Sequence, residues 1–224
     1  MEWDRHDWTG TAADFHAMEL PAQRALWWCQ VEAPTLILGS TQSVDDVRQD
    51  IAAECGVSIT RRRSGGGAVF VHPTDSVWID ITISRNDPLW KDDVAQSMLW
   101  LGECFVAALS QWANAEVYRE SFSSNIDGRV VCFASSSPGE VFVGAHKLVG
   151  ISQRRGRDGA RFQCVLYRHW QPVDWSQILA STDVQSRLAD IAVATLDIPA
   201  QAIVEALSQQ VSALGGEESG EIWG

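Results

Sequence analysis

Several short stretches of the chain alternate apolar and polar residues, which is the pattern of a half-buried β-strand. The alternation is most regular over 76–83, where every second residue is aliphatic. The preceding segment, 72–75, contains a proline and predicts a hairpin-like turn. Further apolar runs predict strands over 25–31, 35–38, 57–60, 68–71, 115–118, 130–133, 140–143, 147–152 and 161–168.

Helical spacing is clearest between Asp93 and Trp112, where apolar residues recur every three or four positions. Ser43 followed by Asp46 is an N-cap pair for a helix over 44–54. Residues 1–10 show neither period and are expected to form a frayed start. Shorter or more amphipathic helices are predicted over 11–20, 175–179, 184–195 and 200–214.

The order of these elements predicts an α+β fold. Most strands follow one another as hairpins rather than in β–helix–β units, so a mainly antiparallel or mixed central sheet flanked by helices is expected. A chain of 224 residues suits one domain, which we place at 1–215. The Gly- and Glu-rich end, 216–224, is expected to be a disordered tail.

Charge narrows the class of ligand. The net charge of -12 disfavours nucleic acid and anionic membranes as partners, and no apolar run is long enough to span a bilayer. Eight of the 17 Lys and Arg residues nevertheless fall within 61–63 and 147–161. Two basic patches on an acidic body indicate a small anionic ligand, although solvated hairpin charges would also explain part of the second patch.

Cysteine and histidine usage gives no metal site. The five cysteines have no C-x-x-C spacing, their number is odd, and no signal peptide precedes them. Reduced thiols in a cytoplasmic protein are therefore expected. The five histidines are equally dispersed.

The stretch 61–72 carries the strongest chemical signal. Three arginines precede Ser64 and three glycines, and an apolar strand follows. Successive backbone N–H groups in a glycine-rich turn can converge on an anion. Three glycines alone are as typical of a surface turn, but such a turn needs neither the arginines nor the strand.

A second segment, 144–155, places Lys147 in an apolar strand. It is one of two lysines in the chain, the other being Lys91. A single lysine in a hairpin arm is usually a solvated strand residue, so its spacing alone does not establish a catalytic role.

Together these segments resemble the lipoate–protein ligase A family of the biotin/lipoate ligase group. The family's Arg-Arg-x-Ser-Gly-Gly-Gly-Ala-Val stands here at 61–69. Its Gly-x-Lys-(Ile/Val)-x-Gly-Ser-Ala-Gln is matched in part at 145–153, and its strand ending in Gly-x-x-Gln is similar to 37–42. The three segments occur in the family's order, and the resemblance covers roughly residues 15–180.

The resemblance implies a class II synthetase/biotin ligase-like fold and a ligase that joins lipoate, or octanoate, and ATP into an acyl-adenylate. The acyl group would pass to a lysine of an apo lipoyl carrier domain, such as a 2-oxoacid dehydrogenase E2 or glycine cleavage H protein. Lys147 would stabilise the acyl and phosphate oxygens. Mg²⁺ would neutralise the phosphates. The remaining site positions implied are Arg62, Ser64, Gly65, Gly66, Gly67, Ala68, Val69, Glu140, Gly150 and Ser152.

Within this assignment the residues have distinct expected tasks. Arg62 is expected to bind phosphate, because its planar guanidinium can grip two oxygens. Gly65–Gly67 would form the floor beneath the acyl and phosphate groups. Val69 and Gly150 would line the tunnel for the aliphatic chain.

The chain departs from the family pattern at several positions. Val71 and His72 stand where many ligases have His-Asp, and Gly139-Glu140 stands where they have Asn-Asp, so that Glu140 keeps only the carboxylate. Ala145, Ile151 and Gln163-Cys164-Val165 replace the family's Gly, Ser and Gln-His-Gly. We also expect no C-terminal accessory domain, which bacterial ligases of this kind usually have, so a separate accessory chain is a possible partner.

Two alternatives follow from these departures. The first is an ATP-independent octanoyl- or lipoyltransferase that forms a thioester on Cys164, a thiol near several arginines. The alternative interpretation is that Cys164 is a buried strand cysteine with no catalytic role. The second alternative is a non-catalytic relative that binds lipoate or an adenylate. Biotin ligation is a weaker option.

Overall fold

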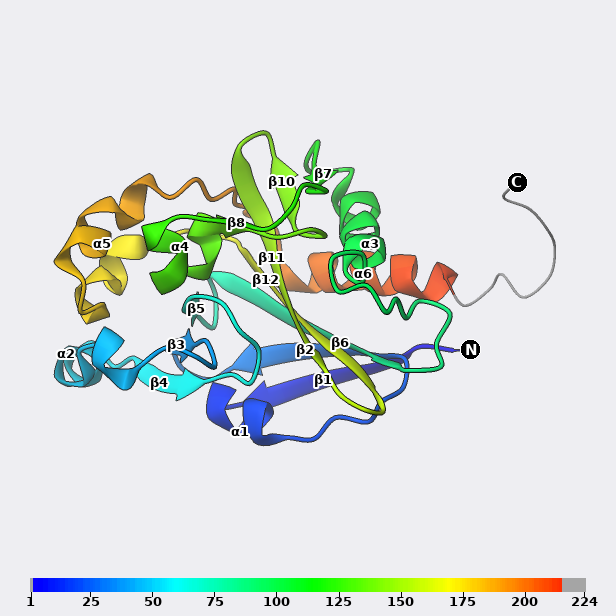
Figure 1. Cartoon of the computed structure of the whole chain (residues 1–224), viewed down its shortest axis with the longest axis horizontal. Coiled ribbons are helices and arrows are strands. Elements are labelled where there is room, and N and C mark those ends of the chain that lie inside the picture. Colours follow the sequence, from blue (N-terminus) through cyan, green and yellow to red (C-terminus); the bar gives the residue numbers. More distant parts are fainter. Residues whose placement is uncertain (1, 215–224) are drawn as a thin grey trace.

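The computed structural model describes residues 2–214, and the expected tail at 216–224 lies outside this range. Its main feature is a seven-stranded sheet in the order β1-β2-β6-β12-β11-β10-β7 (Figure 1). The first two strands are parallel and every other neighbouring pair is antiparallel. The strands are β1 (Asp4–Gly10), β2 (Ala25–Val31), β6 (Ser76–Ser84), β7 (Glu116–Val117), β10 (Val141–Val143), β11 (His146–Arg155) and β12 (Gly159–Tyr167).

A second, three-stranded sheet has the order β4-β3-β5, and two residues each from β8 and β9 form a small ribbon. The helices are distributed around these sheets. The remaining elements are β3 (Thr35–Leu38), β4 (Ser58–Arg61), β5 (Val69–Val71), β8 (Ser123–Ser124), β9 (Ser135–Ser136), α1 (Ala12–Ala17), α2 (Gln49–Glu54), α3 (Leu99–Leu109), α4 (Ile126–Val130), α5 (Thr182–Arg187) and α6 (Ala200–Ala213).

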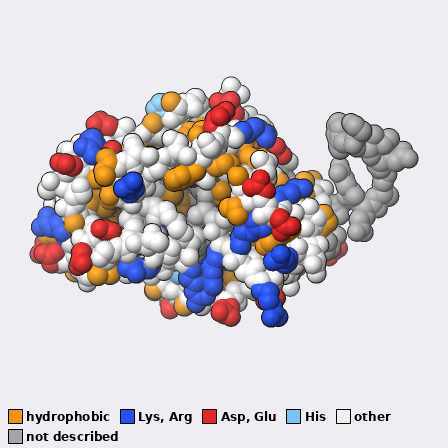
Figure 2. Space-filling view, in the orientation of Figure 1, with side chains coloured by type: hydrophobic (Ala, Val, Ile, Leu, Met, Phe, Trp, Pro, Cys, Tyr) orange, Lys and Arg blue, Asp and Glu red, His pale blue; other side chains and the backbone are white. Residues whose placement is uncertain are grey.

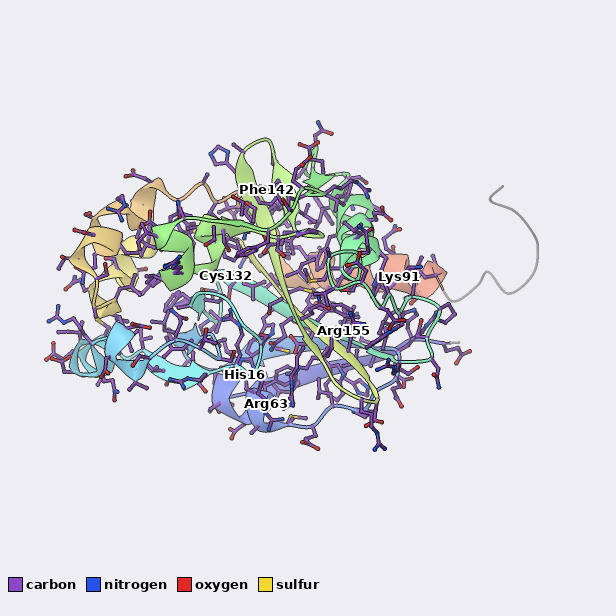
Figure 3. All side chains as sticks on the ribbon, in the orientation of Figure 1. His16, Arg63, Lys91, Cys132, Phe142 and Arg155 are labelled. Atoms are coloured by element: carbon purple, nitrogen blue, oxygen red, sulfur yellow. The ribbon has the colours of Figure 1, made fainter. Side chains whose placement is uncertain are left out.

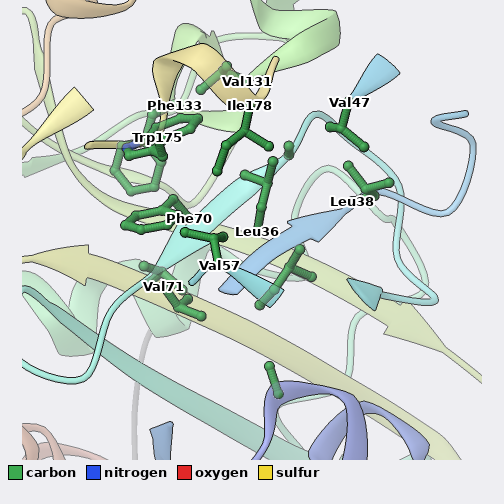
Figure 4. Close-up of a cluster of buried hydrophobic side chains, with 14 of the residues drawn as sticks. Leu36, Leu38, Val47, Val57, Phe70, Val71, Val131, Phe133, Trp175 and Ile178 are labelled. Carbon is green, nitrogen blue, oxygen red and sulfur yellow. The ribbon is translucent and has the colours of Figure 1, made fainter. Parts of the chain in front are cut away.

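The large sheet separates two hydrophobic cores. On one face, Ile79 and Ile81 of β6 pack with Phe105 of α3 and Leu207 of α6. The other face contacts α1 and the small sheet. Its core is built from 36–38, 69–71 and the loop around Trp175, whose ring stacks on Phe70 at 5.3 Å (Figure 4). Because β6 alternates strictly, Trp78 and Asp80 face this second side.

The structure corrects three sequence-based expectations. The start of the described chain is not frayed, because β1 pairs in parallel with β2 along its whole length, from Asp4 to Gly10. The segment 72–75 is not a hairpin turn, since β5 and β6 belong to different sheets. The segment 130–133 is not a strand: Asn125 caps α4, and a 3₁₀ turn follows at Cys132–Ala134.

Other boundaries shift without changing the fold. The helix expected over 93–112 is shorter, the helix over 44–54 is split by an extended Val47, and that over 175–179 is a pair of 3₁₀ turns. The helix expected over 184–195 ends early, as α5 and a 3₁₀ turn. The strands expected over 25–31 and 35–38 are observed with those limits.

Candidate functional site

The glycine-rich loop that follows β4 is held in place by close backbone contacts. A Cβ on Gly67 would lie 2.7 Å from the carbonyl carbon of Val131, and a Cβ on Gly39 would lie 1.8 Å from the oxygen of Gly66. Gly66 itself has a φ of +97°, which favours glycine. A Cβ on Gly65 would meet nothing within 4 Å. Glycine is therefore required at 39 and 67, where a side chain would clash with backbone atoms, and it is favoured at 66 by the positive φ. Position 65 has room for a side chain.

Arg62 holds this loop from within the protein. Its guanidinium donates hydrogen bonds to the carbonyl oxygens of Gly65 and Gly67, both at 2.8 Å, and to that of Ile37 at 3.3 Å. The residue is only 4% exposed, and its Nε has no partner among the described residues. The geometry therefore makes Arg62 a clamp on the loop carbonyls. Its expected role as a phosphate partner stays a prediction.

Lys147 and Glu140 form a buried ion pair. Lys147 Nζ lies 2.8 Å from Glu140 Oε2, and the two side chains are 1% and 2% exposed. The carboxylate also accepts the backbone N–H groups of Ser137 and Ile151 at 2.8 and 3.3 Å. Burial raises the pKa of Glu140, and the neighbouring ammonium opposes this shift.

The ammonium of Lys147 is enclosed on its remaining sides. It donates to the carbonyl oxygen of Cys132 at 3.1 Å, and lies 5.4 and 5.9 Å from the ring centres of Phe133 and Phe142. The backbone of Lys147 is fixed by hydrogen bonds to Ala192 and Ala194, both 2.9 Å long. A fixed positive charge screened from water interacts strongly with charge that develops beside it.

A cavity begins next to this pair, above the face of the large sheet opposite α3 and α6. The empty space between its lining atoms is about 370 Å³, a volume that includes open solvent. Its lining includes Cys132 and Phe133, which lie on the side of Lys147, and also His16 of α1 and Trp78 of β6. Figure 3 shows Cys132 above His16. The walls between them are formed by Ile37, Arg62, Val69, Gly150, Ser152, Gln163 and Val165.

Polar side chains cross the far end of this cavity in a hydrogen-bonded row. Ser64 Oγ lies 3.1 Å from Ser152 Oγ and donates to Gln163 Oε1 at 2.8 Å. Gln163 Nε2 lies 3.3 Å from His16 Nδ1. Burial, together with the charges of Arg161 and Arg62, lowers the pKa of His16 to about 3, so the imidazole is neutral at neutral pH.

A second cavity also has Phe133 in its lining, and the empty space between its lining atoms is about 640 Å³, which includes open solvent. Phe133 and Phe142 line it together with the chain at 134–136 and 190–192. Its polar lining includes Asn125 and Arg187, the latter paired with Asp127 at 2.6 Å. Phe133 is thus shared by the two cavities, and Lys147 lies beneath it.

The comparisons with known proteins agree with this architecture. A family model described as the lipoyl protein ligase A/B catalytic domain matches residues 12–212. The chain belongs to this family. Among curated proteins, none matches it by sequence.

Solved structures of lipoate ligases share the fold. Protein Ta0514 of T. acidophilum, whose structure contains bound lipoic acid, is 16% identical with a TM-score of 0.72, and the match covers 95% of this chain and 86% of that protein. A lipoate-protein ligase A bound with ATP is 16% identical with a TM-score of 0.70, covering 95% and 85%. A bi-partite ligase from Thermoplasma acidophilum, solved in a study with its E2 lipoyl domain, is 17% identical with a TM-score of 0.69, covering 95% and 84%. The predicted α+β lipoate ligase fold is confirmed.

The structure brings most of the positions implied by the family together. Arg62, Val69, Gly150 and Ser152 line the first cavity, and Ser64 reaches Ser152 across it. Ala68 fixes the loop to the 3₁₀ turn, because its N–H and carbonyl bond the backbone of Val130 and Cys132. Lys147 and Glu140 lie behind Phe133.

Three other positions lie outside the first cavity's lining. Val71 is buried in the core, and His72 faces Asp75 at 3.3 Å. Cys164 belongs to the core under α3 and α6, although its neighbours Gln163 and Val165 line the cavity. Burial and the charge of Asp80 raise the pKa of the Cys164 thiol well above its usual range.

The two basic patches of the sequence meet on one side of the molecule. Arg63 and Arg154 line the same groove with Arg157, and Figure 2 shows basic side chains along the lower rim of the hollowed centre. Arg161 also reaches this groove, but it is paired with Asp80 at 2.5 Å. The acidic residues Glu19 and Asp158 lie among these arginines.

Sequence reasoning missed several residues of the cavity. His16, Trp78, Cys132 and Phe133 all line it, yet none lies in a family motif. Trp78 could have been found, because the alternation along 76–83 places it opposite the aliphatic face. His16 gave no signal, since only the packing of α1 against the sheet brings it to Gln163.

The described residues were searched for a metal-binding cluster and for a membrane-spanning helix. Within residues 2–214, no group of three or more His, Cys, Asp or Glu side chains is arranged to hold a metal ion. Over the same range, no helix has both the length and the apolar character required to cross a membrane.

Proposed function

We propose that the chain activates lipoate, or a similar medium-chain carboxylate, with ATP and transfers the acyl group to a lysine of a lipoyl carrier domain. The acyl chain would occupy the first cavity and the nucleotide the second. The observation that carries the proposal is the place of Lys147: it lies beneath Phe133, which both cavities share, with Nζ 5.4 Å from the ring centre.

The first step would join the two ligands beside Lys147. A carboxylate oxygen attacks the α-phosphorus of ATP, the bond to pyrophosphate breaks, and an acyl-adenylate forms. Negative charge builds on the phosphate oxygens, and the ammonium of Lys147 would stabilise it. Glu140 holds that ammonium in position. The glycine loop, held by Arg62, would supply backbone N–H groups to the same oxygens.

The second step would use the same charge differently. The amine of the carrier lysine attacks the acyl carbonyl and gives up one proton to solvent, the bond from the carbonyl carbon to the phosphate oxygen breaks, and AMP leaves with the electron pair of that bond. Charge then gathers on the carbonyl oxygen, again within reach of a fixed ammonium. The T. acidophilum ligase with its E2 lipoyl domain supports a lipoyl carrier as acceptor. Because that ligase is bi-partite, a separate accessory chain is part of the proposal.

The residues fit ATP better than they fit a resident metal. The second cavity offers Asn125, Ser135, Ser136 and Asp190 as hydrogen-bonding groups for a base and a ribose. The described residues form no metal cage, and Mg²⁺ in such sites is usually held by substrate phosphates with one or two carboxylates. Mg²⁺ would therefore enter with the nucleotide and neutralise its phosphates.

The test uses an apo lipoyl domain as acceptor. Wild-type protein with lipoate, ATP and Mg²⁺ is expected to add one lipoyl group to it, visible as a mass increase. Lys147→Ala should abolish the increase, whereas Lys91→Ala should retain it, because Lys91 lines neither cavity. Tight binding of lipoate without any transfer, with and without a partner chain, would instead indicate a non-catalytic relative.

A thioester-forming transferase is the second candidate, and Cys132 is the residue that favours it. This thiol lines the first cavity, and its own carbonyl oxygen bonds Lys147 Nζ, whereas Cys164 faces the opposite side of the sheet. Incubation with an acyl carrier protein that bears an octanoyl thioester, without ATP, should then leave an octanoyl adduct on Cys132. An unmodified Cys132 after such incubation would remove this candidate.

A further inference from the structure

The basic groove beside the β11–β12 turn lies on the same face of the large sheet as the first cavity. Ser152 pairs with Gln163 across the two strands, and both residues line the cavity. Two positions further from Lys147, Arg154 pairs with Arg161, and both residues line the groove. Because alternate residues of a strand point to one face, the groove lies beyond the cavity along that face.

Three arginines of this groove are held only weakly by the protein itself. Arg154 is exposed, and its side chain has no hydrogen bond or ion pair with another of the described residues. The side chain of Arg157 is 94% exposed and lies 3.5 Å from the adjacent carboxylate of Asp158. The guanidinium of Arg63 lies 3.7 Å from the carboxylate of Glu19. Exposed pairs of this kind contribute little free energy, so these cations are available to a partner.

The lining of the groove suits a folded protein better than a nucleic acid. The carboxylates of Glu19 and Asp158 lie among the arginines, and they would repel a uniform chain of phosphates. Met18, Leu20 and Pro21 add apolar surface to the same lining. Arginine beside apolar side chains is typical of protein–protein interfaces, in which charges of the two partners are matched locally.

We propose that this groove docks the lipoyl carrier domain through acidic side chains on the surface of the carrier. The inference rests on the proposed function, which makes such a domain the acyl acceptor. Because the chain has a net charge of -12, most of its surface would repel an acidic carrier, whereas the exposed arginines would attract it. The groove thereby orients the carrier on the sheet face along which the acyl chain would lie.

The distance from the groove to Lys147 suits one small domain. Seven residues of β11 separate Arg154 from Lys147. At about 3.3 Å per residue this is a distance of about 23 Å. A domain of about 100 residues has a radius of gyration of about 13 Å, so its width spans that distance. One part of the carrier can therefore occupy the groove while its acceptor lysine reaches the acyl carbonyl beside Lys147.

The test measures docking separately from chemistry. Binding of a fluorescently labelled apo lipoyl domain of a 2-oxoacid dehydrogenase E2 to the full chain is followed by anisotropy, without ATP. The double variant Arg154→Glu/Arg157→Glu should bind this domain about tenfold more weakly than wild type at low salt, and the difference should shrink at about 0.5 M salt. Arg48→Glu is the matched control, because Arg48 is exposed at the start of α2 and does not line the groove. Pyrophosphate exchange with lipoate and ATP should be equal in all three proteins.

The outcomes distinguish the docking surface from the function. Equal affinity of all three proteins for the apo domain, or no binding by the wild type, would overturn the inference, and the exchange assay would still decide the function. Loss of exchange in the double variant would place the arginines in activation rather than in docking, and would also overturn the inference. Tighter binding of single-stranded DNA than of the lipoyl domain would reassign the groove to nucleic acid. Wild-type protein that docks the domain but shows no exchange would refute the proposed function while the docking surface stood.

Discussion

Lys147 Nζ and Glu140 Oε2 lie 2.8 Å apart in a part of the protein that water does not reach. Removing two charges from water costs several kcal/mol per ion, and an ion pair offsets this only when both partners are well bonded. Here the carboxylate has two backbone donors and the ammonium has a backbone acceptor. The pair therefore holds one positive charge at a defined point between two cavities.

Substitutions of Lys147 and Glu140 should affect stability and activity differently. Lys147→Met leaves Glu140 buried without its counter-charge, so we expect a loss of about 3–5 kcal/mol in the free energy of unfolding. In the double variant Lys147→Met/Glu140→Gln, the neutral amide still accepts one backbone N–H and most of that loss should be recovered. Urea denaturation measures both, and neither variant should form acyl-adenylate. A stable double variant with wild-type activity would refute the role of the lysine.

The glycine loop offers a matched pair of substitutions. Gly67→Ala places a Cβ 2.7–2.8 Å from backbone atoms of Val131 and Cys132, which should cost about 1–3 kcal/mol and displace the loop. Gly65→Ala meets nothing within 4 Å and should change stability by less than about 0.5 kcal/mol. Thermal unfolding compares the two. Equal destabilisation would mean that the loop does not approach Val131 as described.

Arg62 should be irreplaceable by lysine. A single ammonium cannot reach three carbonyls that surround a planar guanidinium, so Arg62→Lys should lose about 2 kcal/mol of stability and at least tenfold in adenylation rate. Arg63→Lys is the control, since that side chain is 46% exposed and its salt bridge within residues 2–214 is to Glu19 at 3.7 Å. Hydrogen exchange of the amides at 64–67 should accelerate in the first variant alone. Unchanged exchange would argue against the clamp.

His16 should make the protein acid-sensitive. Its pKa is about 3 in the folded state and near 6.5 when unfolded, so between these values the unfolded chain binds the extra proton. The contribution to stability is therefore complete above pH 6.5 and is lost as the pH falls towards 3, by up to about 1.4 kcal/mol per pH unit.

The measurement is urea denaturation at pH 7 and pH 5. His16→Asn should flatten the difference between the two pH values, whereas His146→Asn, at an exposed position, should leave it as in the wild type. An unchanged difference in His16→Asn would show that the ring is already accessible to protons in the folded protein.

The rate at which each cysteine is alkylated should depend on whether its thiol is accessible from solvent or from the first cavity. Cys132 lines it and Cys55 is exposed, so both should be alkylated in the native protein, while Cys164 is 1% exposed with a raised pKa and should not be. Lipoate should slow alkylation of Cys132 and leave that of Cys55 unchanged. Mass spectrometry of peptides follows each thiol. Rapid labelling of Cys164 would revive its candidacy as a nucleophile.

Elements that depend on local sequence patterns could be predicted from the sequence, whereas elements that depend on contacts between residues far apart in sequence could not. The strands over 25–31 and 35–38 and the α+β class follow from local apolar patterns, and the glycine and lysine segments from their residue types. The start of the chain was missed, because β1 is an edge strand that alternates exposed polar residues with Trp8 and is stabilised by β2. The turn at Cys132–Ala134 was missed because its contacts to Ala68 are distant in sequence.

Within the site, the sequence identifies which residues belong to the site more readily than it identifies what each side chain contacts. For Arg62 the sequence predicts a phosphate partner, which stays a prediction, but it gives no sign that the guanidinium also holds the carbonyl oxygens of Gly65 and Gly67. Cys164 and Gln163 are neighbours in sequence, and strand alternation sends them to opposite faces. His16 becomes part of the cavity only through the packing of α1 on the sheet.

The central claim is that Lys147 serves ATP-dependent activation of a carboxylate, and pyrophosphate exchange tests it most directly. Wild-type protein with Mg²⁺, ATP and labelled pyrophosphate is assayed in parallel with lipoate, octanoate and biotin. The account predicts label in ATP with lipoate or octanoate, and none with the double variant Lys147→Met/Glu140→Gln. Absence of exchange with every carboxylate, in a protein that still binds lipoate, would contradict it.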